Sequence, residues 1–310
     1  MKGNTEFMST STNAKIVEQL KGISGIPITP FTHEGDVDAI ELQKVVMRIT
    51  DADVELIIAC GNTAEYSSLT QAEIREVTAV TIEAAGDATT LVGIGGDIRS
   101  ALGAVQHAVD VGAAGFMIHA PSHAHVSDIG LLDYYRALAE ATSLPVVIYM
   151  RGREPSDSVL EQVVSMDNVV AIKYANRDIM GFGRLVEHYG EHIVPVCGLA
   201  ESWAPFFWLA GGRGFTSGLV NVAPHLSVQL LNALTVGDFS TARQLWLRIK
   251  PFEQLRERNA NALNVPAVKA AMQLRGYLQN AGVRPPISGL TAEENAELAL
   301  CMSAWEAVDE

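Results

Sequence analysis

Short apolar segments recur along this chain every 20 to 35 residues or so, with longer stretches between them. The segments are rich in valine and isoleucine and mostly lack alternating polar residues, which is typical of strands buried on both faces of a parallel sheet. Parallel strands need crossover connections, and the stretches between the segments are long enough to supply them. The eight segments are Ile23–Phe31, Val54–Cys60, Thr90–Gly95, Gly115–His119, Val146–Tyr149, Val169–Tyr174, Ile193–Cys197 and Gly214–Leu219.

The stretches between these segments carry helix signals. Asp38–Thr50 has apolar residues at helical spacing, and Thr70 with Glu73 forms a capping box at the start of the next stretch. Ser100–Val111 and Gly130–Thr142 follow the same plan. Eight strand–helix units in series predict an α/β fold, a closed TIM (β/α)8 barrel. An open doubly wound sheet is the alternative, because closure cannot be read from a sequence.

The pattern changes after the eighth segment, where only helical stretches follow. We therefore predict three parts: a disordered tail over residues 1–21, the barrel over 22–235 and a C-terminal helical extension over 236–310. The first of the late helices can serve as the eighth helix of the barrel. The predicted late helices are Pro224–Leu234, Phe239–Arg258, Asn264–Ala281 and Thr291–Val308.

Composition limits the classes of partner. The net charge of −14 argues against a nucleic-acid partner and an anionic membrane surface, since both need a basic face. No apolar run approaches the length of a membrane span, and the polar start lacks the apolar centre of a signal peptide. Cys60, Cys197 and Cys301 are too few and too scattered for a disulfide framework or zinc site, and we expect them to be small buried residues. These features predict a cytoplasmic protein with a small-molecule partner.

Lys173 is the residue in these segments that most needs a chemical explanation. It continues the apolar strand Val169–Ile172, where a buried ammonium is costly unless it is paired or used. Burial favours the neutral amine, which is the form that attacks a carbonyl carbon. Lys173 is therefore a candidate nucleophile. The alternative is that it lies at the strand tip and pairs with a carboxylate.

Other polar residues at strand ends should meet Lys173, because active sites of such barrels lie at the carboxyl ends of the strands. Tyr149 ends the preceding segment, and its hydroxyl could pass protons during imine formation. Taken alone, this residue fits a rim tyrosine with a satisfied hydroxyl better. Cys60–Tyr66 forms a small-residue turn in which backbone N–H groups, Asn62 and Thr63 could hold a carboxylate.

In combination, these motifs resemble the dihydrodipicolinate synthase/N-acetylneuraminate lyase family of class I Schiff-base lyases. The resemblance runs from about residue 22 to at least residue 224, and the helical extension also fits. The matching segments are Gly25–Phe31 (first strand), Gly61–Glu65 (the G-[TSN]-T-G-E carboxylate loop), Tyr149 (strand five), Lys173 (the Schiff-base lysine in an I-K pattern) and Gly212–Gly218 with Asn221 (the glycine-rich eighth strand).

The resemblance implies the roles of the matching residues. Lys173 would form a Schiff base with the keto group of a small 2-oxo acid, with Tyr149 as general acid and base. Thr63, together with the backbone amides of Asn62 and Thr63, would hold the substrate carboxylate. No metal and no bound cofactor is required by this chemistry.

Further roles are expected around this set. Ser217 and Gly218 of the glycine-rich strand would bind substrate. Glu65, which follows the carboxylate loop, is expected to make a structural hydrogen bond rather than to touch substrate. The resemblance also implies a homotetramer built as a dimer of dimers.

Three departures bear on the substrate. Asn62 stands where dihydrodipicolinate synthases have the first threonine of their proton relay. His123 stands where they have a relay tyrosine donated across a subunit contact, and it is either a proton carrier and substrate-binding residue or only a rim histidine. Arg151, two residues after Tyr149, is similar to the arginine of the 5-dehydro-4-deoxyglucarate dehydratase group and could bind a distal carboxylate.

These departures favour a 2-oxo-3-deoxy sugar acid as substrate, with dehydration or retro-aldol cleavage as the reaction. The first alternative is 4-hydroxy-tetrahydrodipicolinate (dihydrodipicolinate) synthase activity, in which pyruvate condenses with aspartate semialdehyde. The alternative of another class is a non-catalytic sensor or binding protein for 2-oxo acids. An intact set of Lys173, Tyr149 and Thr63 argues against a binder, which does not need a buried amine.

Overall fold

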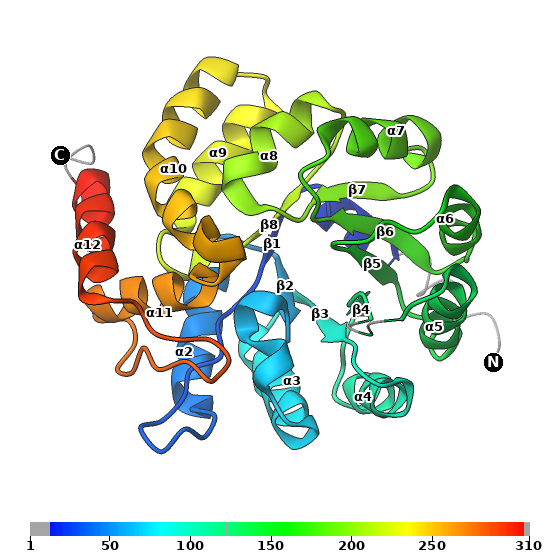
Figure 1. Cartoon of the computed structure of the whole chain (residues 1–310), viewed down its shortest axis with the longest axis horizontal. Coiled ribbons are helices and arrows are strands. Elements are labelled where there is room, and N and C mark those ends of the chain that lie inside the picture. The colour runs from blue at the N-terminus through cyan, green and yellow to red at the C-terminus, as the bar shows by residue number, and fades with distance from the viewer. Residues whose placement is uncertain (1–12, 122, 124, 307–310) are drawn as a thin grey trace.

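A computed structural model of the protein describes residues 13–121, 123 and 125–306. Eight parallel strands form a closed barrel in which each strand pairs with its successor and β8 pairs with β1 (Figure 1). This arrangement confirms the predicted barrel and excludes the open sheet. The strands are β1 (Ile23–Gly25), β2 (Leu56–Ala59), β3 (Thr89–Ile94), β4 (Gly115–Ile118), β5 (Val146–Met150), β6 (Val169–Tyr174), β7 (Val194–Cys197) and β8 (Phe215–Ser217).

Helices surround the barrel, and each predicted crossover is one of them. Thr70 and Glu73 form the predicted capping box at the start of α3. None of the helices in the described ranges has the length and apolar content needed to span a bilayer. The barrel helices are α2 (Ala39–Thr50), α3 (Gln71–Ala85), α4 (Ile98–Asp110), α5 (Asp128–Glu140), α6 (Asp157–Val164), α7 (Ile179–Tyr189), α8 (Ala200–Leu209) and α9 (Pro224–Thr235).

The first and eighth strands are shorter than predicted. The first apolar segment pairs only over Ile23–Gly25, because Pro27 and Pro30 have no N–H to donate to a ladder. The eighth ends at Ser217 and turns into the 3-10 turn η3 (Leu219–Asn221). Both segments remain buried after the strand ends, which is why apolar character alone overestimates their length.

The prediction of a disordered tail is wrong for residues 13–21, which are ordered. Residues 13–19 are helical, and Ile16 and Leu20 are fully buried in the same cluster as Leu56 and Leu91. Their spacing of four residues puts both side chains on one helix face, which covers apolar groups of the barrel interior. Residues 1–12 lie outside the described ranges, and the boundary at 235/236 stays a prediction.

Three late helices complete the molecule: α10 (Phe239–Asn261), α11 (Asn264–Leu274) and α12 (Ala292–Glu306). α11 ends at Leu274 rather than at the predicted Ala281, and Gly276 beyond it adopts a positive φ of +71°. Phe252 and Trp305 pack edge to face at 5.2 Å and belong to the same core cluster as barrel residues. The extension therefore shares its core with the barrel.

The end of α10 is irregular. Asn259, Ala260 and Asn261 are three consecutive residues with positive φ, of 50°, 58° and 70°. Such conformations cost free energy for residues other than glycine, although asparagine tolerates them better than most. This turn joins α10 to α11 and aims the chain across the barrel mouth.

Candidate active site

Lys173 and Tyr149 lie opposite each other in the pairing of β6 with β5. Lys173 is only 3% exposed. Its Nζ lies 4.3 Å from the centre of the Tyr149 ring and 3.7 Å from Sδ of Met117. No carboxylate in the described part of the chain forms an ion pair with it, so the alternative of a paired strand-tip lysine does not hold.

The surroundings of Lys173 favour its neutral form. Burial lowers the pKa of its amine to about 7, and the positive charge of Arg151 acts in the same direction. A lysine in water has a pKa of about 10.4, so almost none of it would be neutral at pH 7. Here a large fraction of the amine is free to act as a nucleophile.

The hydroxyl of Tyr149 accepts a hydrogen bond from Nδ2 of Asn62 at 3.0 Å. Burial raises the pKa of this phenol, while the nearby Arg151 and the Asn62 bond partly offset the effect. The phenol therefore carries its proton at neutral pH and can donate it. It stands between the amine and the carboxylate loop, as a proton carrier would need to.

The carboxylate loop is a tight 3-10 turn, η1 (Asn62–Ala64), that follows β2. The first N–H groups of such a turn have no acceptor inside it, which leaves those of Asn62 and Thr63 available to an anion. Thr63 is buried at the cavity wall. Thr29 holds the turn from behind by donating from its Oγ1 to the carbonyl oxygen of Ala64 at 2.7 Å.

Glu65 anchors the loop to the C-terminal helices, which fits its expected structural role. It forms a fully buried ion pair with Lys269 of α11 at 2.5 Å and accepts a bond from the backbone N–H of Arg284 at 3.1 Å. Lys269 also donates to the carbonyl oxygen of Gly282 at 2.8 Å. The loop that follows β2 is thus held in place by residues more than 200 positions later.

These groups converge on one cavity of about 110 Å³. Six of the predicted site residues line it, namely Asn62, Thr63, Tyr149, Arg151, Lys173 and Gly218. The remaining lining residues are Ile26, Ala175, Gly198, Leu199, Ala200, Thr216, Glu253, Arg256, Glu257, Asn261 and Asn264.

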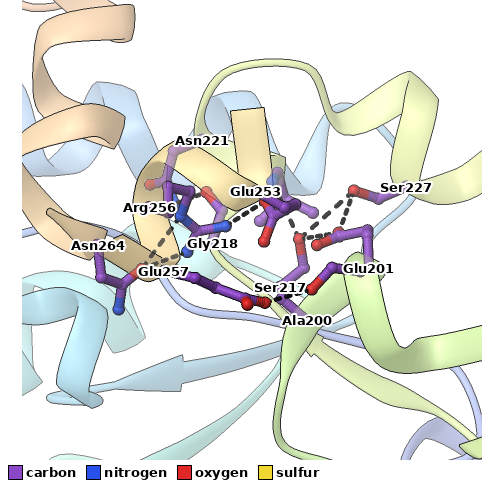
Figure 2. A network of polar contacts seen from close by, with 12 residues as sticks. Ala200, Glu201, Ser217, Gly218, Asn221, Ser227, Glu253, Arg256, Glu257 and Asn264 are labelled. Carbon is purple, nitrogen blue, oxygen red and sulfur yellow. Dashed lines mark hydrogen bonds and ion pairs between the residues drawn. The ribbon is translucent and has the colours of Figure 1, made fainter. Parts of the chain in front are cut away.

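Two predicted substrate-binding residues lie elsewhere. Ser217 is fully buried behind the cavity wall, where its hydroxyl donates to Glu201 and lies 3.4 Å from the hydroxyl of Ser227 (Figure 2). Successive residues of a strand face opposite sides, so Thr216 faces the cavity while Ser217 faces α8 and α9. Gly218 is the first residue beyond β8 and lines the cavity as well. His123 is exposed and is not among the lining residues; its Nδ1 accepts a bond from the N–H of His125.

The sequence did not predict that the C-terminal helices form one wall of the cavity. Glu253, Arg256 and Asn264 form a polar group there, in which Arg256 donates to both of the others (Figure 2). These residues lie on helices that follow the barrel, whereas the sequence predicts site residues only at strand ends. The only available signal was a cluster of charged residues in a helix that also carries apolar residues.

His119 lies at the end of β4 but is neutral and structural. Its Nε2 bonds to the carbonyl oxygen of Cys60 at 3.0 Å, and its ring stacks on Tyr66 with centroids 4.4 Å apart. Burial lowers the pKa of His119 to about 4. Among the residues that the structure describes, no group of three or more His, Cys, Asp or Glu is arranged to hold a metal ion.

A barrel that holds a desolvated amine against a phenol, beside a turn suited to a carboxylate, defines a lyase acting on carbonyl compounds. Comparison with known proteins narrows this class. The profile described as Dihydrodipicolinate synthetase family matches residues 19–305, and the chain belongs to that family.

Individual relatives agree. The chain is 30% identical to a 4-hydroxy-tetrahydrodipicolinate synthase of Methanococcoides burtonii, covering 91% of this chain and 97% of that protein. It is 26% identical to a probable 5-dehydro-4-deoxyglucarate dehydratase of Oceanobacillus iheyensis, covering 89% of this chain and 92% of that protein. The crystal structure of a dihydrodipicolinate synthase from Bacillus clausii superimposes with a TM-score of 0.90 at 38% identity, covering 94% of this chain and 99% of that one.

Proposed function

We propose that the protein forms a Schiff base between Lys173 and the keto carbon of a small 2-oxo acid. The neutral amine adds to the carbonyl to give a carbinolamine, which loses water to give an iminium ion. The observation that carries this proposal is the burial of the Lys173 amine against Tyr149, with its pKa lowered to about 7.

Tyr149 would serve as the proton carrier in these steps. Its hydroxyl can protonate the oxygen that leaves the carbinolamine as water and take up a proton from the substrate later. Asn62 donates to the same oxygen at 3.0 Å and so fixes its position. The substrate carboxylate would lie on the N–H groups of Asn62 and Thr63.

The substrate that we favour is a 2-oxo-3-deoxy sugar acid. The iminium ion withdraws electrons, so that C3 can lose a proton and C4 its hydroxyl as water, or the C3–C4 bond can break in a retro-aldol step. Arg151 lines the cavity beside the amine and is suited to a distal carboxylate. The relative named as a probable 5-dehydro-4-deoxyglucarate dehydratase supports this substrate class.

The second candidate is the condensation of pyruvate with aspartate semialdehyde. It is favoured by the names of several relatives, including the synthase of Methanococcoides burtonii. Against it stand Asn62 in place of the relay threonine and the exposed position of His123 within a single chain. We propose a role for His123 only in a homotetramer, where it would lie at the cavity of a neighbouring subunit.

Reductive trapping tests the shared chemistry. Borohydride added with pyruvate should increase the mass of the peptide that holds Lys173, and Lys173→Ala should remain unmodified. An unmodified wild-type lysine together with measurable pyruvate binding would instead indicate a non-catalytic 2-oxo-acid sensor.

Turnover then separates the candidates. A panel of 2-oxo-3-deoxy sugar acids should release water or pyruvate, while pyruvate with aspartate semialdehyde serves as the comparison reaction. Arg151→Gln should weaken turnover of dicarboxylic substrates much more than that of monocarboxylic ones. Turnover restricted to aspartate semialdehyde would overturn the sugar-acid assignment.

The assembly and location are part of the proposal. We infer a homotetramer, a dimer of dimers, in the cytoplasm, which suits three free buried cysteines. Sedimentation velocity of the purified protein tests the tetramer, and a monomer at micromolar concentration would contradict it.

A further inference from the structure

Arg256 reaches the carboxylate loop from the outer wall of the cavity. It lies on α10, is 4% exposed and lines the cavity next to Gly218. A Cβ atom at Gly218 would overlap Nη2 of Arg256 and would lie 3.2 Å from Cγ2 of Thr63. The guanidinium is therefore next to the turn proposed to hold the substrate carboxylate, in space that exists because residue 218 has no side chain.

Hydrogen bonds fix the orientation of the Arg256 guanidinium but do not use all of its N–H donors. Its Nε and Nη2 donate to Oδ1 of Asn264 at 3.0 and 2.6 Å, and its Nη1 donates to Glu253 (Figure 2). A guanidinium has five N–H donors. These three bonds leave two donors, one on each terminal nitrogen. A pair of this kind matches the two oxygens of a carboxylate.

The surrounding charges permit an anion to bind there. Arg256 shares its buried region with two carboxyl groups, those of Glu253 and Glu201, and Glu257 lies next along the helix. The carboxylate of Glu257 forms an ion pair with Arg177 at 2.7 Å and accepts a hydrogen bond from the hydroxyl of Ser202 at 2.8 Å. Glu201 accepts bonds from Ser217 and Ser227.

Glu253 can give up its charge when the anion arrives. Burial raises the pKa of this carboxyl to about 7; Arg256 opposes that effect, while Glu201 and Glu257 add to it. Close to neutral pH the carboxylate of Glu253 can therefore take up a proton. The guanidinium of Arg256 then lacks a charged partner there, which an anionic ligand can replace. Replacing the charge of Glu253 by that of a ligand keeps the buried region balanced.

The backbone that follows Arg256 adopts an unusual conformation that helps to form the cavity wall. The left-handed turn at Asn259, Ala260 and Asn261 follows directly, and it places both Asn261 and Asn264 in the cavity wall. Local strain of this kind persists where surrounding contacts over-determine it, and it concentrates at functional sites.

We propose that Arg256 is a specificity-determining residue that binds the C1 carboxylate of the 2-oxo acid together with the turn at Thr63. The proposal rests on the function proposed above. It assigns Arg256 to the carboxylate that every 2-oxo acid carries and leaves Arg151 for the distal end of longer substrates.

Trapping of Lys173 with two ligands tests this role. Pyruvate carries the carboxylate, and methyl pyruvate has the same keto carbon without the charge. The half-saturation concentration for borohydride trapping is measured for wild type, Arg256→Lys and the double variant Glu253→Gln/Arg256→Gln. The double variant removes both partners of the buried pair, so that the carboxylate of Glu253 is not left without its cation. Arg258→Gln is the control, because that arginine lies on the same helix as Arg256 but is exposed and pairs with Glu297 of α12.

The half-saturation concentration for pyruvate should rise about tenfold or more in the double variant and less in Arg256→Lys, which keeps the charge. The value for methyl pyruvate should change little, and Arg258→Gln should match wild type. Equal weakening for both ligands, or no change for pyruvate, would overturn the proposal. Failure of wild-type Lys173 to be trapped would instead refute the Schiff-base function itself.

Discussion

Tyr149 and Lys173 are paired residues of adjacent strands, and the amine of one lies 4.3 Å from the ring centre of the other. Because paired residues face the same side of a sheet, both side chains point into the barrel. A cation above an aromatic face would be stabilised, yet burial opposes the charge and lowers the pKa of Lys173 to about 7. Burial therefore outweighs the attraction of the ring.

Lys173→Ala should abolish turnover while the fold survives. The change removes the nucleophile and also removes a buried amine that is costly to desolvate, so the midpoint of thermal unfolding should not fall appreciably. Turnover and circular dichroism check the two parts. Lys44→Ala, at an exposed position on α2, should behave as wild type. Normal turnover by Lys173→Ala would refute the mechanism.

Tyr149→Phe should lower kcat by a factor of about 10²–10⁴, the usual contribution of a positioned general acid or base. The ring that packs on Lys173 is retained, so only the hydroxyl is tested. Tyr134→Phe is a matched control, since its buried hydroxyl has no hydrogen-bond partner among the residues that the structure describes. Comparable losses in both variants would show that the effect is not specific to the cavity.

Imine formation should depend on pH with a midpoint near 7. Below the pKa of Lys173, about 7, the amine is protonated and unreactive. The trapping rate should therefore fall about tenfold for each pH unit below the midpoint and level off above it. Cyanoborohydride trapping of saturating pyruvate between pH 5 and 10 measures this. A rate that kept rising to pH 10 would mean that the lysine is not desolvated.

Gly218→Ala should impair substrate binding. The added Cβ would overlap Nη2 of Arg256, which Asn264 and Glu253 prevent from moving away freely. Overpacking of this kind costs about 1–3 kcal/mol. KM should rise, and the unfolding midpoint in urea should fall. Gly183→Ala on α7 is the control: its Cβ would meet nothing within 4 Å, so it should keep full activity.

Lys269→Met should destabilise the protein by about 3–5 kcal/mol, because it leaves the carboxylate of Glu65 buried without its partner. The double variant Glu65→Gln/Lys269→Met should recover much of this loss. Urea unfolding measures both. Lys21→Met, which breaks an exposed pair with Glu18, should change little. Equal destabilisation in the single and double variants would mean that the pair is not what holds the loop.

Most of the barrel could be predicted because parallel strands buried on both faces have a distinctive composition. Val169–Tyr174 is such a case, since its predicted bounds are those of β6. The extent of the first strand could not be predicted, because burial continues beyond the last ladder bond. The helix over residues 13–19 was missed because its start is polar and only Ile16 and Leu20 give it a buried face.

The site could be predicted in part for a related reason. Lys173, Tyr149 and Thr63 belong to strand ends, whose meeting place follows from the topology of the barrel. Ser217 and Gly218 are neighbours in one motif, and only the orientation of the strand decides which of them faces the cavity. Arg256 lies beside Gly218, as Thr63 does, because of the path of a helix almost 200 residues after Thr63, which no local pattern records.

The wall formed by residues 253–264 has a consequence for synthesis of the chain. The ribosome makes all eight strands before it makes this wall, so the cavity that holds the Lys173 amine stays open on one side until residues 253–264 are added. A hydrated lysine keeps its proton and does not attack carbonyl compounds. Reactivity would therefore switch on only when the late helices dock, after the rest of the catalytic domain has formed.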